Sequence, residues 1–193
     1  MIHDPNQVLT AICHSVNYDT VMNDILLLAL LLGGRKYGYQ LKREAGWMTR
    51  QAALHNNIVY PRLRKFLQEG WVSKRSVPGD RGQTRQQYAL TAEGRRTLME
   101  RLSQFADADA ASEEAFRMRL GLIEYLKPEV RESLFAGREK YLQHRDEALE
   151  SLQDKMDLGK FGREIVRYMR KQIEMEQDWI GHLRRMARAA SRD

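Results

Sequence analysis

The stretch LHNNIVYPRLRKFLQEG, residues 54–70, limits the possible folds most strongly, because it combines helical spacing, a glycine stop and a proline near its beginning. Proline in a helix interior costs about 3 kcal/mol, so its place on the helix matters. Pro61 falls on the polar side of the helical wheel, within about one turn of the predicted start, where few N–H groups have intrahelical partners. The buried stripe is predicted to consist of Val59, Tyr60, Leu63, Phe66 and Leu67.

The opposite side of this helix combines amides with cations. Asn and Gln side chains can bond base edges, and Arg and Lys can bond guanine or phosphate, so such a face suits insertion into a DNA groove. For any single helix, a merely solvated polar face is the alternative. The DNA-contacting residues predicted on this helix are Asn56, Asn57, Pro61, Arg64, Lys65 and Gln68.

Two further helices and a strand pair surround this stretch. We expect a helix over about 18–32, which ends at a Gly-Gly pair, and a short one over about 37–44. Residues 71–77 and 84–90 favour strands, and the intervening PGDRGQ has strong turn chemistry, so a β-hairpin is predicted. Thr91 is placed to cap a following helix that begins AEGRR.

The predicted hairpin carries several cations and almost no acid except Asp80. Three helices followed by a two-stranded wing is the plan of a winged helix-turn-helix domain, in which the third helix reads DNA and the hairpin flanks it. Basic residues on the hairpin make phosphate contacts plausible beside the helix. The predicted DNA-contacting residues of the wing are Lys74, Arg75, Arg81 and Arg85.

The excess of positive over negative charge lies entirely in the first half of the chain. Residues 1–100 hold 14 Lys and Arg against 8 Asp and Glu, whereas residues 101–193 hold 18 of each kind, and the net charge is +6. This asymmetry indicates an anionic partner that is bound by one half only.

The second half is predicted to be helical and to dimerise. The small, polar text SQFADADAAS, residues 103–112, indicates a boundary between a domain at 1–104 and one at 113–193. Pro128 begins a long helix, and a break at 157–162 precedes a last helix with a narrow apolar seam. Two such helices need burial against each other or a second subunit, so we expect a homodimer. The seam of the last helix is Ile165, Tyr168, Met169, Ile173, Trp179, Ile180, Leu183 and Met186.

The segments LLLALLLGGRKYGYQLKREAG, VYPRLRKFLQEGWV and QQYALTAEGRRTL, in this order and spacing, resemble the PadR family of bacterial transcriptional regulators. The resemblance covers about residues 22–100 closely. It implies a mainly α fold with a small β-hairpin: a winged helix-turn-helix domain followed by a helical dimerisation domain. It also implies a repressor that binds a pseudo-palindromic operator as a homodimer.

The resemblance assigns reading positions to Asn57, Pro61, Arg64 and Lys65, with wing contacts near Arg81 and Arg85. It assigns Tyr60 to the core. It further implies control by a small aromatic or hydrophobic effector. Trp47 and Trp179 are the candidate ligand residues, with a dimer contact as the alternative for Trp179.

Other classes of function lack their signatures. The sequence has no phosphate-cradling Gly loop, no Gly-x-Ser-x-Gly and no His-Glu-x-x-His, so no enzyme is expected, and we expect no cofactor. The carboxylates of the second half favour i,i+4 ion pairs with Arg and Lys. Cys13-His14 falls short of a metal ligand set, and a lone cysteine fits a reducing compartment.

The apolar run at 25–32 is too short to span a membrane, and the N-terminus has no signal-peptide pattern, so a cytoplasmic protein is expected. Two alternatives to a PadR-like regulator stay open: a protein–protein adaptor on a winged-helix scaffold, and a winged-helix regulator of the MarR type.

Overall fold

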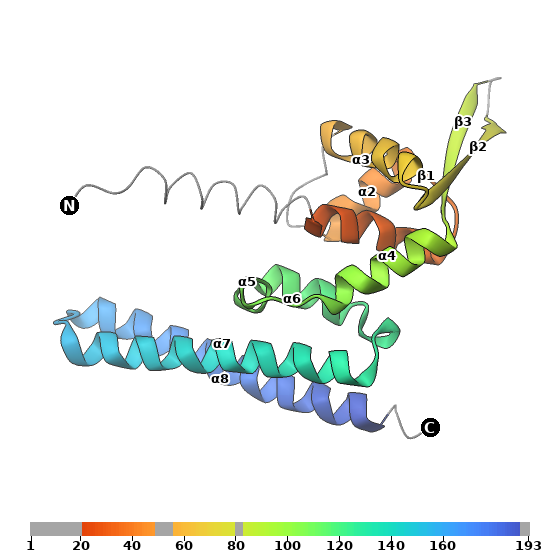
Figure 1. The fold of residues 1–193 in the computed structure, drawn as a ribbon. Helices are drawn as coiled ribbons and strands as arrows, with labels where there is room; N and C mark the ends of the chain where they lie inside the picture. The colour runs from red at the N-terminus through yellow and green to blue at the C-terminus, as the bar shows by residue number, and fades with distance from the viewer. Residues whose placement is uncertain (1–20, 49–55, 80–82, 190–193) are drawn as a thin grey trace, which may run out of the picture. The chain divides into compact units, whose positions relative to one another are not determined.

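The computed structural model describes residues 21–48, 56–79 and 83–189, with no placement for the side chains of residues 47 and 48. The chain divides into two compact units, Met1–Leu102 and Ser103–Asp193. It is mainly helical, with one small sheet. Figure 1 labels the strands β1 to β3 and the helices α2 to α4 of the first unit. The elements of this unit are helical residues 21–30, η1 (Leu31–Gly33), β1 (Lys36–Tyr37), α2 (Gly38–Met48), α3 (Asn56–Gln68), β2 (Val72–Pro78), β3 (Thr84–Leu90) and α4 (Ala92–Ser103).

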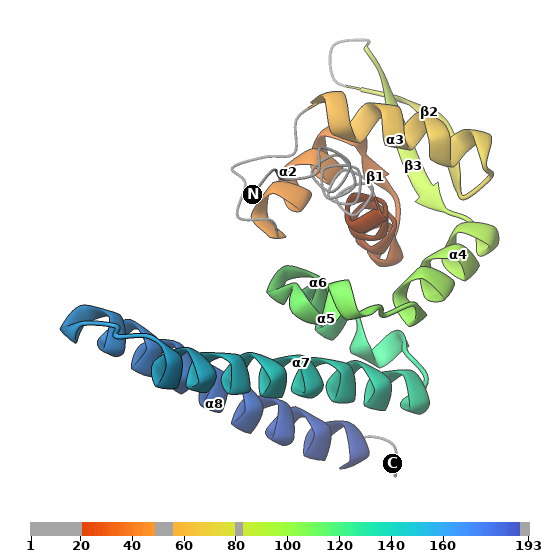
Figure 2. The ribbon, with the colours of Figure 1, turned by 60° about the vertical axis from the view of Figure 1, so that its left-hand side comes forward.

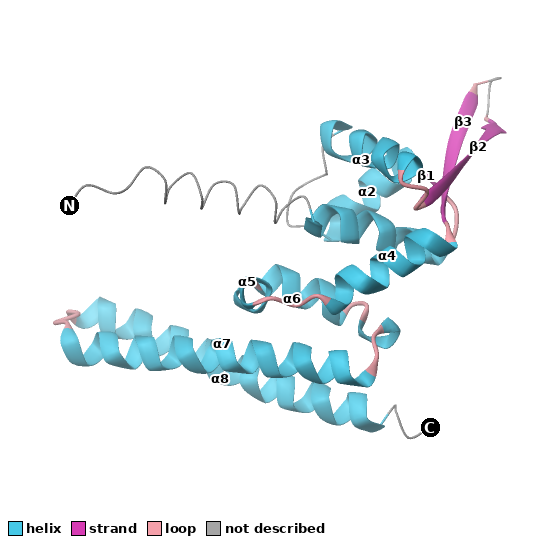
Figure 3. Cartoon of the chain, in the orientation of Figure 1, coloured by secondary structure: helices cyan, strands magenta, loops and turns pink. Residues whose placement is uncertain are grey.

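The sheet is antiparallel with strand order β1-β3-β2 (Figure 3). The predicted hairpin is confirmed, because β2 pairs with β3 from Val72 opposite Leu90 to Pro78 opposite Thr84. A third strand was not predicted: Lys36 pairs with Tyr88 at the other edge of β3. This strand has only two residues and therefore shows no alternation in the sequence.

The core of the first unit is formed by the apolar helix before η1 and by one side of α3 and α4. Ile25, Leu27 and Leu28 are fully buried, as the apolar run predicted. Val59, Leu63 and Phe66 provide the buried side of α3. Because these residues repeat every three or four positions, α3 presents its other side to solvent.

Two predicted helix boundaries are confirmed. Gly70 has φ +71°, and the Trp71 N–H donates to the Phe66 carbonyl at 2.8 Å, which is the six-to-one bond of a Schellman motif. At the start of α4, the Thr91 hydroxyl oxygen accepts from the Gly94 N–H at 3.0 Å. The Thr91 hydroxyl also donates to the carbonyls of Gly70 and Trp71, at 2.7 and 3.0 Å. One residue therefore joins the end of α3 to the start of α4.

The second unit contains two long helices and three short ones. Figure 2 shows α7 and α8 lying side by side along their length. Pro128 is the first residue of α7, as expected. The small, polar segment taken as a boundary contains α5, whose buried Asp109 and Ala110 belong to this unit. The elements are α5 (Asp107–Ala111), α6 (Glu113–Leu120), η3 (Ile123–Tyr125), α7 (Pro128–Lys155) and α8 (Lys160–Ala189).

Three bidentate arginine–carboxylate pairs join α7 to α8. Arg138 bonds Glu176 at 2.8 and 3.0 Å, Arg170 bonds Asp146 at 2.8 and 2.9 Å, and Arg184 bonds both oxygens of Glu139 at 2.8 Å. The expectation that carboxylates here pair within one helix is therefore only partly correct. These three arginines instead specify how the two helices align, because a bidentate pair has one geometry.

The expectation of one narrow seam on α8 is wrong, because its apolar residues form two adjacent seams. The inner seam packs on α7 and includes the buried Val166, Ile173 and Ile180. The outer seam repeats at alternating spacings of four and three, and all its members are exposed. It consists of Phe161, Ile165, Tyr168, Gln172, Met175, Trp179, His182 and Met186. Among the described residues, none of the helices combines the length and hydropathy that a membrane crossing requires.

Candidate nucleic-acid interface

The outer face of α3 is exposed along its whole length. It includes the six residues that the sequence predicted there. It also includes Tyr60, whose relative exposure is 40%, so the prediction of a buried Tyr60 is wrong. The tyrosine ring lies against Gly38 at the start of α2, where an added Cβ would come within 2.9 Å of Tyr60 Cε1. The missing side chain of Gly38 thus leaves room for an aromatic ring near the surface.

Pro61 is the sixth residue of α3 rather than a member of its first turn. Its missing N–H therefore removes one intrahelical bond, to the Asn57 carbonyl. The sequence analysis placed the proline within about one turn of the helix start, where little hydrogen bonding is lost. Because Pro61 and Asn57 are both exposed, water can hydrate the released carbonyl oxygen.

The two neighbouring cations of the outer face differ in their surroundings. Arg64 has no ion pair within the part of the chain that the structure describes. Lys65 Nζ, in contrast, lies 3.4 Å from Asp24 Oδ2 and 5.6 Å from the centre of the Trp71 ring. Arg64 is therefore the cation of α3 that is free to meet a base or a phosphate.

The buried carboxylate of Asp24 pairs with three cations of the first unit, Arg62, Lys65 and Arg101. The side chain of Asp24 is 1% exposed, and Arg62 Nε lies 3.2 Å from its Oδ1. Arg101 Nη1 of α4 donates to Oδ2 at 3.1 Å, and the Arg101 guanidinium lies 4.8 Å from the Trp71 ring centre. One carboxylate thus links α3 to α4. Because its partners are 38 to 77 residues away, the sequence gives no local signal for the cluster.

The wing presents two exposed cations on β2, Lys74 and Arg75. Arg75 Nε donates to Gln87 Oε1 across the hairpin at 3.0 Å, which orients the guanidinium along the sheet. Arg85 on β3 is half-buried, and its Nε lies 2.8 Å from the position of a Cβ added at Gly79. The fourth predicted wing residue, Arg81, lies outside the described residues.

Four tyrosines gather beside the outer face of α3, and the sequence analysis assigned none of them to the site. Tyr37 and Tyr39 flank Gly38, on which the Tyr60 ring lies. Tyr88 lies on β3 opposite Lys36 and is buried. Burial, together with repulsion between its phenolate and that of Tyr60, raises the pKa of Tyr88 above its usual value. Gly38 and Tyr39, within the first of the three segments that resemble the family, were the sequence signal that could have located this cluster.

Of the two candidate ligand residues, Trp47 and Trp179, the structure describes the side chain of Trp179 only. Trp47 lies in the last turn of α2, and its side chain falls outside the described residues. Trp179 is 41% exposed and lines a cavity of about 740 Å³ inside the second unit. Arg138 and Tyr141 of α7 and Met169 and Met175 of α8 line the same cavity.

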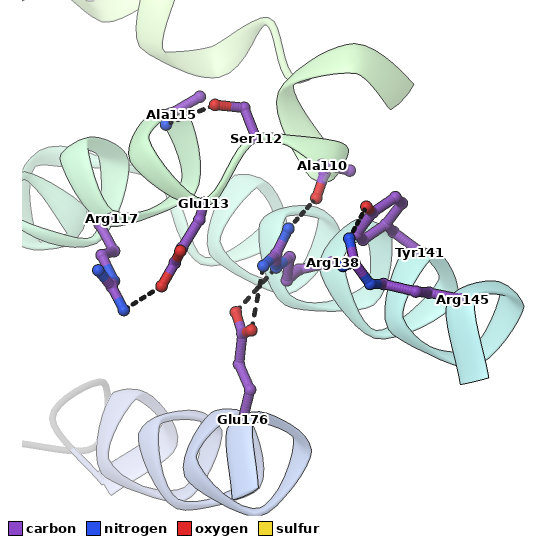
Figure 4. A network of polar contacts seen from close by, with 9 residues as sticks. All are labelled: Ala110, Ser112, Glu113, Ala115, Arg117, Arg138, Tyr141, Arg145 and Glu176. Carbon is purple, nitrogen blue, oxygen red and sulfur yellow. Dashed lines mark hydrogen bonds and ion pairs between the residues drawn. The ribbon is translucent and has the colours of Figure 1, made fainter. Parts of the chain in front are cut away.

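Bonds among the lining residues, and one to the Ala110 carbonyl, hold the polar wall of this cavity (Figure 4). Arg138 donates to the Ala110 carbonyl at 2.6 Å as well as to Glu176. Arg145 Nη1 donates to the Tyr141 hydroxyl at 3.0 Å, and Arg117 forms an ion pair with Glu113. No group of three or more His, Cys, Asp or Glu that could hold a metal occurs within 21–48, 56–79 and 83–189. Cys13 and His14, which the sequence analysis judged too few for a metal site, lie outside these ranges.

Three helices followed by a two-stranded wing, with an exposed amide-and-cation face on the third helix, define a winged helix-turn-helix protein. Residues 27–100 match the model of the transcriptional regulator PadR-like family. The N-terminal unit therefore carries a PadR-like transcriptional-regulator domain.

Several solved structures are similar to the chain, whereas no curated protein matches it. Bacillus subtilis PadR in complex with operator DNA is 19% identical, with a TM-score of 0.42, over 85% of this chain and 98% of that one. A putative transcriptional regulator from Thermoplasma acidophilum, TA0346, is 20% identical, with a TM-score of 0.43, over 56% of this chain and 92% of that one. RosR from H. salinarum is 24% identical, with a TM-score of 0.38, over 53% of this chain and 88% of that one.

Proposed function

We propose that this protein is a transcriptional repressor that binds a pseudo-palindromic DNA operator as a homodimer. The observation that carries the proposal is the exposed face of α3, where Asn57, Arg64 and Gln68 lie on one side of the helix. The Arg64 guanidinium has no ion pair in the described part of the chain. Amides and a free guanidinium at this spacing suit hydrogen bonds to base edges in the major groove. Repression would follow from occlusion of the promoter.

The wing supplies the sequence-independent part of the proposed contact. Lys74 and Arg75 are exposed on β2, the strand that follows α3 after a turn of three residues. Cations beside a reading helix suit the phosphate backbone. The excess of positive charge in residues 1–100 supports the same assignment of DNA to this unit.

The outer seam of α8 supports the homodimer. Its apolar members include Phe161, Tyr168 and Met175, which are 82%, 62% and 67% exposed. A row of large apolar side chains at heptad spacing, left open to water, is the pattern by which two helices pack together. A symmetric dimer would place two α3 helices about 34 Å apart, on successive turns of one face of the DNA.

The cavity beside Trp179 supports control by a small aromatic or hydrophobic effector. Its size lies in the range of small-molecule sites, and Trp179, Tyr141 and two methionines provide apolar and aromatic contacts. Because Trp179 also belongs to the outer seam, a ligand there would act directly on the proposed dimer contact. Quenching of Trp179 fluorescence by an effector, absent in Trp179→Phe, would test this part of the proposal.

A band-shift titration over salt concentration tests DNA binding itself. The binding constant should fall log-linearly with salt, with a slope of about 0.9 per phosphate contact. Arg64→Ala should lower the affinity for a selected operator by about 1–3 kcal/mol if Arg64 bonds a base. An adaptor protein would instead show no duplex binding at any salt concentration, and that result would reject the proposal.

A further inference from the structure

Tyr37 and Tyr39 form a stacked pair immediately before and within the first turn of α2. Their ring centres are 5.6 Å apart and their planes differ by 13°. The Tyr37 N–H donates to Gln40 Oε1 at 2.8 Å, which fixes the backbone at the start of the helix. The stacked pair is therefore held in place from both the side chains and the main chain.

The stacked pair and Tyr60 belong to one surface. Gly38, between the two stacked residues, lies under the Tyr60 ring, and Tyr60 lies one turn from Arg64 on the outer face of α3. Tyr39 is 50% exposed and Tyr60 is 40% exposed. The aromatic cluster thus continues the proposed DNA-reading face from α3 onto the beginning of α2.

The exposed groups of this surface are hydroxyls rather than ring faces. Neither Tyr39 nor Tyr60 has a hydrogen bond from its hydroxyl within the described residues, and a face of Tyr39 is already occupied by Tyr37. Stacking on unpaired bases requires free ring faces. A phenol hydroxyl, in contrast, can donate to a phosphate oxygen of duplex DNA, and the first helix of a helix-turn-helix crosses the backbone.

We propose that the hydroxyls of Tyr39 and Tyr60 donate hydrogen bonds to phosphate oxygens of duplex DNA, next to the bases that α3 reads. This inference rests on the proposed DNA-binding function and adds an uncharged contact that its cations do not supply. Because a phenol carries no charge at neutral pH, it displaces no condensed cation in the way that Lys or Arg does. The contact should therefore contribute affinity that is nearly independent of salt.

The experiment measures fluorescence anisotropy of a labelled, mixed-sequence duplex of about 30 base pairs with the full chain, from about 50 to 200 mM salt. Tyr39→Phe and Tyr60→Phe should each weaken binding about three- to tenfold, with the salt slope of wild type. Lys74→Gln, on the wing that is proposed to contact phosphate, should weaken binding and also reduce the slope by about 1. Phenylalanine keeps the ring packing, and equal thermal unfolding curves would verify the fold.

Tyr125→Phe is the matched control, because Tyr125 is 51% exposed in the second unit and should leave affinity unchanged. Wild-type affinity in both Tyr39→Phe and Tyr60→Phe would overturn the inference while the proposed function stands. A reduced salt slope in these variants, or an equal loss in Tyr125→Phe, would overturn it as well. Absence of duplex binding by the wild type would overturn the proposed function and the inference with it.

Discussion

Lys65 Nζ, on the outer face of α3, lies 3.4 Å from Oδ2 of the buried Asp24. The neighbouring Arg64 has no such partner in the described part of the chain. Two adjacent cations that look equivalent in the sequence are thus different in the fold, because one of them already has a counter-charge.

Arg64→Gln should therefore weaken DNA binding more than Lys65→Gln. A cation that is already paired gives up part of its interaction with Asp24 before it can contact a phosphate, whereas Arg64 loses only hydration. Titrations of a selected operator duplex at fixed salt provide the measurement, with the larger loss of affinity expected for Arg64→Gln. Equal losses in the two variants would show that the pairing with Asp24 has no effect on binding.

Asp24→Asn should destabilise the first unit by about 3 kcal/mol, because it removes the buried counter-charge of Arg62, Lys65 and Arg101. Urea unfolding followed by circular dichroism measures the change. Glu100→Gln is the control: Glu100 is exposed and pairs with Arg96 at 3.9 Å, so its loss should stay within about 0.5 kcal/mol. An equally small effect of Asp24→Asn would contradict the structural role assigned to this carboxylate.

Gly94→Ala should destabilise the junction of wing and α4 by about 2–3 kcal/mol, because an added Cβ would overlap the Trp71 carbonyl oxygen. That oxygen belongs to the backbone and also accepts the Thr91 N–H at 3.0 Å, so it has little freedom to move away. Gly33→Ala is the matched control, since an added Cβ there meets nothing within 4 Å. Thermal unfolding compares the two variants, and similar melting temperatures for Gly94→Ala and Gly33→Ala would contradict the predicted overlap at position 94.

The Arg170–Asp146 pair should make the α7–α8 hairpin sensitive to acid. Hydrogen bonds from the Arg170 guanidinium lower the pKa of Asp146 below its ordinary value. A carboxyl whose pKa is lowered by folding stabilises the fold above its unfolded pKa, about 3.9, and loses this contribution as the pH falls through the folded pKa. The difference in the free energy of unfolding between wild type and Asp146→Asn should thus be constant near pH 5–7 and shrink below about pH 4. A difference independent of pH would argue against the pair.

Met175→Glu should convert the proposed dimer into monomer, because it places a charge in the middle of the outer seam of α8. Light scattering after size-exclusion chromatography gives the mass. Lys171→Glu introduces the same side chain one turn away, at an exposed position off the seam, and should keep the mass of the dimer. A wild type of monomeric mass would reject the dimer, and a dimeric Met175→Glu would place the contact elsewhere.

Local signals were sufficient for most elements of the fold. The PGD turn and its flanks predicted β2 and β3, Gly70 predicted the end of α3, and Thr91 predicted the start of α4. A signal for α6 was present but not used: Ser112 precedes two glutamates, and its hydroxyl accepts the Ala115 N–H at 3.2 Å. That pattern is typical of a helix start.

Features that depend on tertiary contacts were not predictable from periodicity. Tyr60 lies at the border of the apolar stripe of α3, and only the absence of a side chain at Gly38 lets its ring stay near the surface. Asp24 gathers partners from 38 to 77 residues away. The apolar spacing of α8 likewise predicted one seam where the fold has two. Members of the two seams are neighbours in the sequence, as Trp179 and Ile180 are, so spacing alone does not separate them.

The three bidentate arginines between α7 and α8 limit the ways in which this hairpin can move. Sliding α8 by one helical turn, about 5.4 Å, would separate all three pairs at once, since each is made at 2.8–3.0 Å. A register ratchet between the two helices would therefore have to break six charge-assisted bonds together. A conformational change that involves this hairpin should consequently move α7 and α8 together as a rigid body, without a change in their alignment.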